Sequence, residues 1–423
     1  MRQLKISTAL PYEKLLEFSR SQAWFAFIIT DPDNFVAGFG SKRNLVLREP
    51  KGAFQSVSEF LSGAQSRVAG YLGYDLKNDI ENLHSELPDF LDLPEACLFE
   101  PEVWVCASGN EVTLTGDPEW VDRLENHLKR ENGFEKRKAS PLDVRCTTNK
   151  NAYIESAEKL LAHIKRGNIY EVNYCVQFTA HSPIFDPQSR FEDLRQRTAA
   201  PFSVFARLSD RYILCASPER FLRHINGKLI SQPIKGTIRR DGNPNVDCRL
   251  REQLRHDPKE ISENVMIVDL VRNDLSRVAA GGSVKVDELC GIYPFKTVYH
   301  MISTVGAELD GQYRPLDAIR ACFPAGSMTG APKIRAMELI EELENFKRGP
   351  YAGNFGYFEP NGNFDLNVVI RTLIYNPHTH RIGFSVGSAL TIGSHPEREF
   401  DECMLKAEAL ISALHGSLED RTD

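Results

Sequence analysis

The order of the predicted strands and helices is the feature that most constrains the fold of this chain. After residue 150 the predicted strands follow one another in hairpin-like groups and do not alternate regularly with helices. This order favours an α+β layered sandwich of antiparallel-rich sheets flanked by helices over a doubly wound parallel sheet. The predicted strands are Tyr212–Ala216, Phe221–Ile225, Gly356–Phe358, Leu366–Leu373 and Arg381–Val386. The predicted helices are Tyr153–Arg166, Glu260–Arg277, Pro332–Leu343 and Glu397–Leu414.

A polar connector is predicted to divide the chain near residues 131–150. There Glu131-Asn132-Gly133 leads into the basic run 135–138, which is typical of a solvated linker. We therefore expect an amino-terminal part, residues 1–140, and a larger region, residues 145–416. In the first part, two alternating segments on either side of Ser108-Gly109-Asn110 predict a hairpin.

Composition and charge exclude several classes of protein. The 423 residues are 42% hydrophobic and carry a net charge of −7, which suits a buried core and argues against a nucleic-acid partner. The apolar runs are shorter than the ~18 residues that a membrane helix needs, and the first residues do not resemble a signal peptide. Nine cysteines without a Cys-x-x-Cys pair predict reduced thiols. We expect a cytoplasmic protein with no membrane partner.

Two predicted helices each carry a pair of carboxylates. Glu399 and Glu402 lie three residues apart on the last helix, and Glu260 and Glu263 repeat this spacing on an earlier one. Two such helices together could hold one hard cation, because Mg²⁺ prefers oxygen ligands and keeps some of its waters. The alternative is that both pairs belong to solvated faces of amphipathic helices, and the spacing leaves this open.

Three further features are candidates for binding an anionic substrate. The small residues of segment 325–331, ahead of a helix, would let a ligand approach free backbone N–H groups, although an ordinary helix entry is the alternative. Arg371 lies in an apolar run, where its fork could bind a substrate carboxylate or a structural partner such as Asp365 or Glu359. His300 is a lone histidine in an apolar stretch, and such a histidine is more often a core residue with its hydrogen bonds satisfied.

Lys235 lies between Pro233 and Gly236, two residues that fix the backbone path. A lysine in a desolvated pocket has a lowered pKa and becomes a nucleophile, so we expect such a pocket to depress the pKa of Lys235. An exposed cation at a strand end is the alternative that this position alone leaves open.

Taken together, these segments resemble the chorismate-utilising enzymes, a family that includes anthranilate synthase component I, aminodeoxychorismate synthase component I, and the isochorismate and salicylate synthases. The resemblance covers roughly residues 150–414 and extends more weakly to Gly70–Leu76. Five motifs occur in the order found in the family. They are Ala216–Phe221, Pro233–Thr237, Glu263–Asp274, Phe323–Lys333 and Ile370–Thr372.

Within the family, Lys235 is the discriminating residue. Aminodeoxychorismate synthases resemble this chain in carrying Pro-Ile-Lys-Gly-Thr, whereas anthranilate synthases usually have Ala in place of the Lys. Isochorismate and salicylate synthases use a different lysine, where this chain has Glu171. The resemblance therefore implies conversion of chorismate and ammonia to 4-amino-4-deoxychorismate, for p-aminobenzoate and folate biosynthesis. Anthranilate synthase and a non-catalytic chorismate or tryptophan sensor are the alternatives.

The resemblance also implies a role for each candidate residue. Lys235 would attack C2 of the ring while Glu219 protonates the departing 4-hydroxyl, and His300 would lie at the ring. Glu263 and Glu402 would bind Mg²⁺ directly, and Glu260 and Glu399 would bind it through water. The residues implied in substrate binding are Arg371, Lys406, Tyr357, Ser327 and Gly387.

Two departures from the family pattern bear on these roles. Relatives often have three glycines where this chain has Gly387-Ser388-Ala389, and Glu171 replaces a common Gln. The chain lacks the Gly-x-Cys-x-Gly turn of a glutamine amidotransferase. The resemblance therefore implies a separate amidotransferase subunit that delivers ammonia, or the use of free ammonia.

Overall fold

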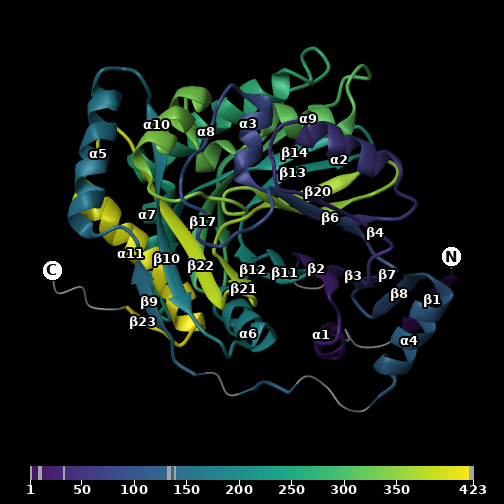
Figure 1. Ribbon diagram of the computed structural model, residues 1–423. Coiled ribbons are helices and arrows are strands. Elements are labelled where there is room, and N and C mark those ends of the chain that lie inside the picture. Colours follow the sequence, from purple (N-terminus) through teal and green to yellow (C-terminus); the bar gives the residue numbers. More distant parts are fainter. Residues whose placement is uncertain (1, 8–11, 32–33, 131–134, 138–139, 419–423) are drawn as a thin grey trace.

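Two large sheets form the centre of the molecule in the computed structural model, which describes residues 2–7, 12–31, 34–130, 135–137 and 140–418 (Figure 1). The larger sheet has 13 strands, and its neighbours along the main path are antiparallel except for the β23–β9 pair. Its order is β1 (Arg2–Ser7), β8 (Glu111–Gly116), β7 (Val103–Ser108), β3 (Asn34–Phe39), β2 (Trp24–Asp31), β11 (Phe202–Leu208), β12 (Arg211–Ser217), β21 (Thr372–Asn376), β22 (Arg381–Leu390), β10 (Glu171–His181), β9 (Asp143–Cys146) and β23 (Ser417–Leu418), with β18 (Gly330–Ala331) beside β10.

The smaller sheet has 10 strands, all paired antiparallel. Its order is β15 (Ile234–Arg239), β17 (Val298–Glu308), β14 (Lys228–Gln232), β13 (Arg220–Ile225), β20 (Phe364–Val368), β19 (Asn354–Phe358), β5 (Val68–Leu72), β6 (Ala96–Glu100) and β4 (Arg43–Leu47), with β16 (Lys285–Pro294) beside β17.

Both sheets combine strands from the two predicted parts of the chain. In the larger sheet β2 pairs with β11, and in the smaller one β5 pairs with β19. The hairpin expected around Ser108-Gly109-Asn110 is present as β7 and β8. The connector expected near residues 131–150 lies partly outside the described residues.

The two sheets pack face to face and are covered on their outer faces by helices (Figure 1). Strand β2 shows why each sheet can pack on both faces, because successive side chains of a strand point to opposite sides. Phe25 and Phe27 face the helices, while Ala26 and Ile28 join the core between the sheets. The predicted α+β layered sandwich is confirmed. The larger sheet packs on α1 (Tyr12–Ser19), α4 (Pro118–Leu128), α5 (Lys150–Lys165), α6 (Pro187–Thr198), α10 (Lys333–Leu343) and α11 (Pro396–Ala413).

The smaller sheet packs on α2 (Ala53–Ser62), α8 (Pro258–Ser276) and α9 (Pro315–Cys322). Helix α7 (Pro244–Arg255) covers the end of this sheet near β15 and β17, and the short α3 (Lys77–Ile80) follows β5. No helix in the described ranges is long and apolar enough to cross a bilayer.

The segment Leu366–Leu373, expected to be one strand, is two strands in different sheets. Strand β20 ends at Val368 in the smaller sheet and β21 begins at Thr372 in the larger one. Arg371 has a φ of 51°, a left-handed conformation outside the extended range of a regular strand. The prediction of one strand is therefore wrong, because the chain crosses from one sheet to the other immediately before Thr372. This crossing puts Arg371 between the sheets.

The small-residue segment 325–331 is held by a buried ion pair at its end. The ammonium of Lys333, in the first turn of α10, bonds the Asp274 carboxylate of α8 and donates to the Cys322 carbonyl at 2.8 Å. Gly330 fits against β10 because a Cβ there would lie 2.1 Å from the Glu171 carbonyl oxygen. Lys333 therefore fixes the loop and does not reach a ligand through its ammonium group.

We expect Lys333→Met to destabilise the protein by about 3–5 kcal/mol, because it leaves the Asp274 carboxylate buried and without its partner. Urea unfolding at neutral pH measures this loss. The double variant Lys333→Met, Asp274→Leu removes both charges and should recover most of it. Equal losses in the single and double variants would contradict the pairing.

Candidate active site

Glu219 and Ser327 are both buried and are joined by a hydrogen bond. Glu219 lies between β12 and β13 and is only 4% exposed, while Ser327 belongs to the short 3₁₀ turn Gly326–Met328. The Ser327 hydroxyl donates to Oε1 of Glu219 at 2.7 Å. Burial raises the pKa of Glu219 to about 7, against the opposing effects of this hydrogen bond and of the Lys235 charge. A carboxyl group that holds its proton near neutral pH is suited to act as a general acid.

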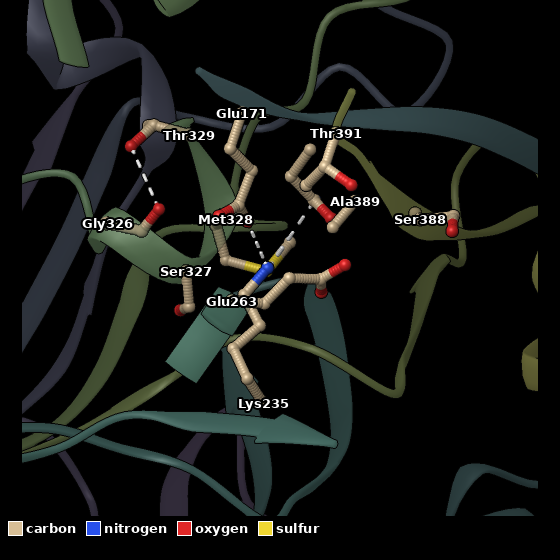
Figure 2. A network of polar contacts seen from close by, with 12 residues as sticks. Glu171, Lys235, Glu263, Gly326, Ser327, Met328, Thr329, Ser388, Ala389 and Thr391 are labelled. Carbon is tan, nitrogen blue, oxygen red and sulfur yellow. Dashed lines mark hydrogen bonds and ion pairs between the residues drawn. The ribbon is translucent and has the colours of Figure 1, made fainter. Parts of the chain in front are cut away.

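Lys235 and Glu171 form a buried ion pair between the two sheets. Lys235 is on β15 of the smaller sheet, and Glu171 is on β10 of the larger one. Figure 2 shows the lysine amine directed at the Glu171 carboxylate, with Glu263 beside it. The second Glu171 oxygen, Oε2, is buried without a hydrogen bond. The pair therefore places a primary amine inside the molecule.

The expectation of a lowered pKa for Lys235 is wrong. Burial acts to lower the pKa of this amine, but the negative charges of Glu171 and Glu263 outweigh burial and raise it. The carboxylates that compensate the desolvation of Lys235 lie on β10 and α8, so the residues next to Lys235 in the sequence give no sign of them. The Lys235 amine must therefore pass a proton to another group before it can act as a nucleophile.

The two acidic helices converge, as the paired carboxylates suggested. Glu263 on α8 is buried, and burial raises its pKa to about 7. Glu399 on α11 accepts hydrogen bonds from Ser388 and, at 3.2 Å, from the Lys259 ammonium of α8. The same ammonium lies 3.8 Å from Oε1 of Glu263, an oxygen that has no hydrogen bond. Lys259 thus links the two helices.

The remaining two carboxylates lie around the same point. Burial raises the pKa of Glu260. At Glu402, burial acts to raise the pKa, but the ammonium of Lys406, 2.7 Å away, outweighs it and lowers the pKa. Within the described part of the chain, no three carboxylate, imidazole or thiolate groups already form a metal cage. The oxygen donors and the unbonded Glu263 oxygen nevertheless fit a hard cation, provided that the side chains close around it.

Arg371 and His300 add two groups that can bind an anion. Burial lowers the pKa of Arg371 to about 10, so the guanidinium stays charged at neutral pH. Burial and the charge of Arg371 lower the pKa of His300, which is therefore neutral. Nδ1 of His300 lies 2.8 Å from the Thr237 hydroxyl, and Nε2 is buried without a partner. Nε2 is therefore available to a ligand.

The other predicted substrate-binding residues divide into two groups. Lys406 donates to the carbonyl oxygen of Gly387 at 2.8 Å and so lies beside the acidic helices. Tyr357 packs elsewhere: the Arg67 guanidinium lies 5.5 Å from its ring centre, and its ring borders the core between the sheets. The structure does not bring Tyr357 into contact with Lys235 or the carboxylates. Gly387 is therefore close to the acidic helices, and Tyr357 is not.

Two residues of the candidate site, Glu171 and Lys259, were not among the site residues expected from the sequence. Glu171 was noticed only as a departure from a family pattern, and its partner lies 64 residues away. Lys259 precedes Glu263 by one helical turn, so helical spacing places both on one face of α8. That spacing could have identified Lys259, whereas no local signal could have paired Glu171 with Lys235.

Comparisons with known proteins indicate a family and a fold for this chain. A profile of the protein family described as chorismate binding enzyme matches residues 13–412. Anthranilate synthase component 1 of Thermus thermophilus is 36% identical over 360 residues, which cover 82% of this chain and 77% of that protein. Aminodeoxychorismate synthase component 1 of Klebsiella aerogenes is 34% identical over 366 residues, which cover 84% of this chain and 78% of that protein.

Two further comparisons concern length and fold. The chloroplastic aminodeoxychorismate synthase of Arabidopsis thaliana is 42% identical over 269 residues, which cover 63% of this chain but only 29% of that longer protein. The crystal structure of anthranilate synthase component I from Streptococcus pneumoniae has a TM-score of 0.76 at 24% identity. It covers 97% of this chain and 92% of that one, so the two proteins share their fold.

The raised pKa of Glu219 predicts a specific dependence of stability on pH. The folded state holds this proton up to about pH 7, whereas the ordinary pKa is 4.5, so the stabilisation is complete below pH 4.5 and is lost as the pH rises through 7. Glu219→Gln removes this dependence. We therefore compare the unfolding free energy of wild type with that of the variant. The difference, wild type minus variant, should fall by up to about 3 kcal/mol between pH 5 and 8.

Urea unfolding at several pH values measures the difference between wild type and Glu219→Gln. Glu111→Gln is the matched control, since Glu111 is exposed on β8 and should give a constant difference. A constant difference for Glu219→Gln as well would show that Glu219 is ionised throughout this range.

Proposed function

Because this chain belongs to the chorismate binding enzyme family, we propose that it transfers an amino group from ammonia to C4 of chorismate and forms 4-amino-4-deoxychorismate. The observation that carries the proposal is the buried amine of Lys235. The charges of Glu171, Glu263 and Glu219 all act on this amine, so the nucleophile and the acid candidate belong to one group of side chains. Relatives named aminodeoxychorismate synthase component 1 support the same reaction.

The proposed reaction begins with Lys235 and Glu219. Glu171, the ion-pair partner, is placed to take a proton from the Lys235 ammonium. The free amine then forms a bond to C2 of the ring, the ring double bonds shift, and the C4–O bond breaks. Glu219 gives its proton to the departing hydroxyl, which leaves as water. Ammonia attacks C4 in the second step, and the electron pair of the C2–N bond returns to Lys235.

Several side chains around Lys235 and Glu219 are proposed to position the substrate and the acid. The Arg371 guanidinium would fork onto one carboxylate, Nε2 of His300 would contact the ring, and Ser327 would keep Glu219 oriented. Lys406 and the backbone of Gly387 would lie near the second carboxylate. Tyr357 has no part in this proposal, because its ring packs against Arg67.

The four carboxylates of α8 and α11 are proposed to hold Mg²⁺. Glu263 and Glu402 would bind it directly, and Glu260 and Glu399 would bind it through water. When bound, the cation supplies positive charge that neutralises and orients a ring carboxylate. The unbonded buried oxygen of Glu263 supports this assignment, since an orphaned buried oxygen is costly without a partner.

We propose that ammonia reaches this chain from a separate glutamine amidotransferase subunit. The sequence lacks a Gly-x-Cys-x-Gly turn, and relatives named component 1 imply a second component. Free ammonium salts should replace that subunit in an assay.

Anthranilate synthase is the second candidate function. The Thermus thermophilus relative of that name is 36% identical to this chain. The two reactions share chorismate and ammonia and differ in product, so analysis of the product separates them. The buried lysine favours amination at C4, because a covalent bond at C2 would occupy the position that anthranilate formation must aminate.

We expect wild-type protein to convert chorismate, Mg²⁺ and an ammonium salt to 4-amino-4-deoxychorismate, and Lys235→Ala to lose this activity. Without ammonia, intact-protein mass spectrometry should show an adduct on Lys235 that disappears when ammonia is added. Lys228→Ala, at an exposed position in β14, is the matched control and should behave as wild type. Anthranilate as the product, or full activity of Lys235→Ala, would contradict the proposal.

Arg371→Lys tests the proposed carboxylate contact. A lysine keeps the charge but loses the two parallel hydrogen bonds, so kcat/KM should fall about tenfold or more, as expected for ~1.5–3 kcal/mol. Steady-state kinetics with chorismate as the varied substrate measure the change, and circular dichroism checks the fold. Unchanged kinetics would assign Arg371 to the structure of the sheet crossing alone.

A further inference from the structure

We infer that Lys259 is a tethered cation that occupies the space between the two acidic helices and competes there with a divalent metal ion. Its ammonium lies 3.2 Å from Oε1 of Glu399 and 3.8 Å from Oε1 of Glu263. These two oxygens come from different helices, so the ammonium stands between α8 and α11. The inference rests on the metal site of the proposed function and adds the residue that sets its affinity.

The surrounding charges show that Lys259 acts on the whole acidic group. The negative charges of Glu399, Glu263 and Glu402 act on its ammonium, and the Lys259 charge in turn acts on Glu260. Two other cations face the group, because the charges of Lys406 and Lys235 both act on Glu402. Lys406 is held by the Gly387 carbonyl and Lys235 by Glu171. Lys259 is therefore the cation that bridges the two metal-binding helices.

Lys259 is exposed to solvent, unlike Lys235 and Lys333, whose side chains are buried. Its side chain is 45% exposed, whereas the side chains of Lys235 and Lys333 are 10% and 9% exposed. A lysine ammonium is strongly hydrated and has a flexible stem, so it can move into water without a large penalty. An incoming divalent cation would bind Glu263 directly and Glu399 through water, and so would expel the ammonium from both carboxylates.

This exchange has a direct consequence for metal affinity. With Lys259 in place, the buried carboxylates are partly neutralised before any metal arrives, so part of the attraction for the metal has already been satisfied. Binding must break the contacts of Lys259 with Glu263 and Glu399 and must bring a second positive charge close to the first. Removing the ammonium should therefore tighten metal binding, and keeping the charge should not.

Binding of Mn²⁺ alone tests the inference without any need for turnover. Electron paramagnetic resonance of free Mn²⁺ gives the Kd for the full chain in the absence of chorismate. We expect Lys259→Gln to lower this Kd about tenfold relative to wild type. Lys259→Met is the second variant, because it keeps most of the apolar stem and should show the same effect if Lys259→Gln folds poorly.

Two controls separate the position of Lys259 from its charge. Arg272→Gln removes one positive charge from an exposed position farther along α8 and should leave the Kd unchanged. Lys259→Arg keeps the charge and should not tighten binding. Thermal unfolding gives an independent readout: Mn²⁺ should raise the Tm of Lys259→Gln more than that of wild type, because the ligand binds the folded variant more tightly.

Each outcome has a defined meaning. Tighter binding by Lys259→Gln and Lys259→Met, but not by Arg272→Gln, supports the inference. An equal or higher Kd in both Lys259 variants overturns it and leaves the metal site intact. Absence of Mn²⁺ binding in wild type and in both variants overturns the metal site itself, together with the inference. If Arg272→Gln tightens Mn²⁺ binding as much as the Lys259 variants do, the effect comes from the net charge of the protein and not from the position of Lys259. That result would also overturn the inference.

Discussion

A buried ion pair between the two sheets, Lys235 of β15 with Glu171 of β10, is the interaction on which the site depends. Neither side chain could be buried alone at acceptable cost, since an isolated charge in the interior is strongly disfavoured. The pair therefore requires both sheets to be in place and in register. It also fixes the lysine amine next to Glu263 and Glu219, whose charges act on it. The contact between Lys235 and Glu171 therefore links the packing of the two sheets to the position of the amine.

Local sequence patterns were sufficient to predict the two helices that carry the acidic part of the site. Helical spacing predicted the helices that contain the two carboxylate pairs, and α8 and α11 are present close to the expected limits. Lys235 was recognised from its fixed backbone and from its family motif. The layered α+β architecture followed from strands that were grouped in hairpins, and the two sheets confirm it.

The rest depended on contacts between residues distant in sequence. The apolar run Leu366–Leu373 gave no sign that the chain changes sheets within it, because both halves are equally suited to a buried strand. The raised pKa of Lys235 follows from carboxylates on another strand and on a helix. The family resemblance implies a substrate contact for Tyr357, but its ring direction depends on which face of β19 meets the other sheet. Such features are properties of the packed sheets and not of any one segment.

The pairing of β5 with β19 and of β2 with β11 has a consequence for how the molecule is made. During synthesis, β5 is made long before its partner β19, and β2 is made long before its partner β11. Strand β10, which carries Glu171, gains its neighbour β22 only when residues 381–390 are available. Non-local strand pairing is slow, and unpaired edges attract other chains. The centre of the molecule is therefore assembled late, and a nascent chain must keep several apolar strand edges apart until its carboxyl-terminal third has been translated.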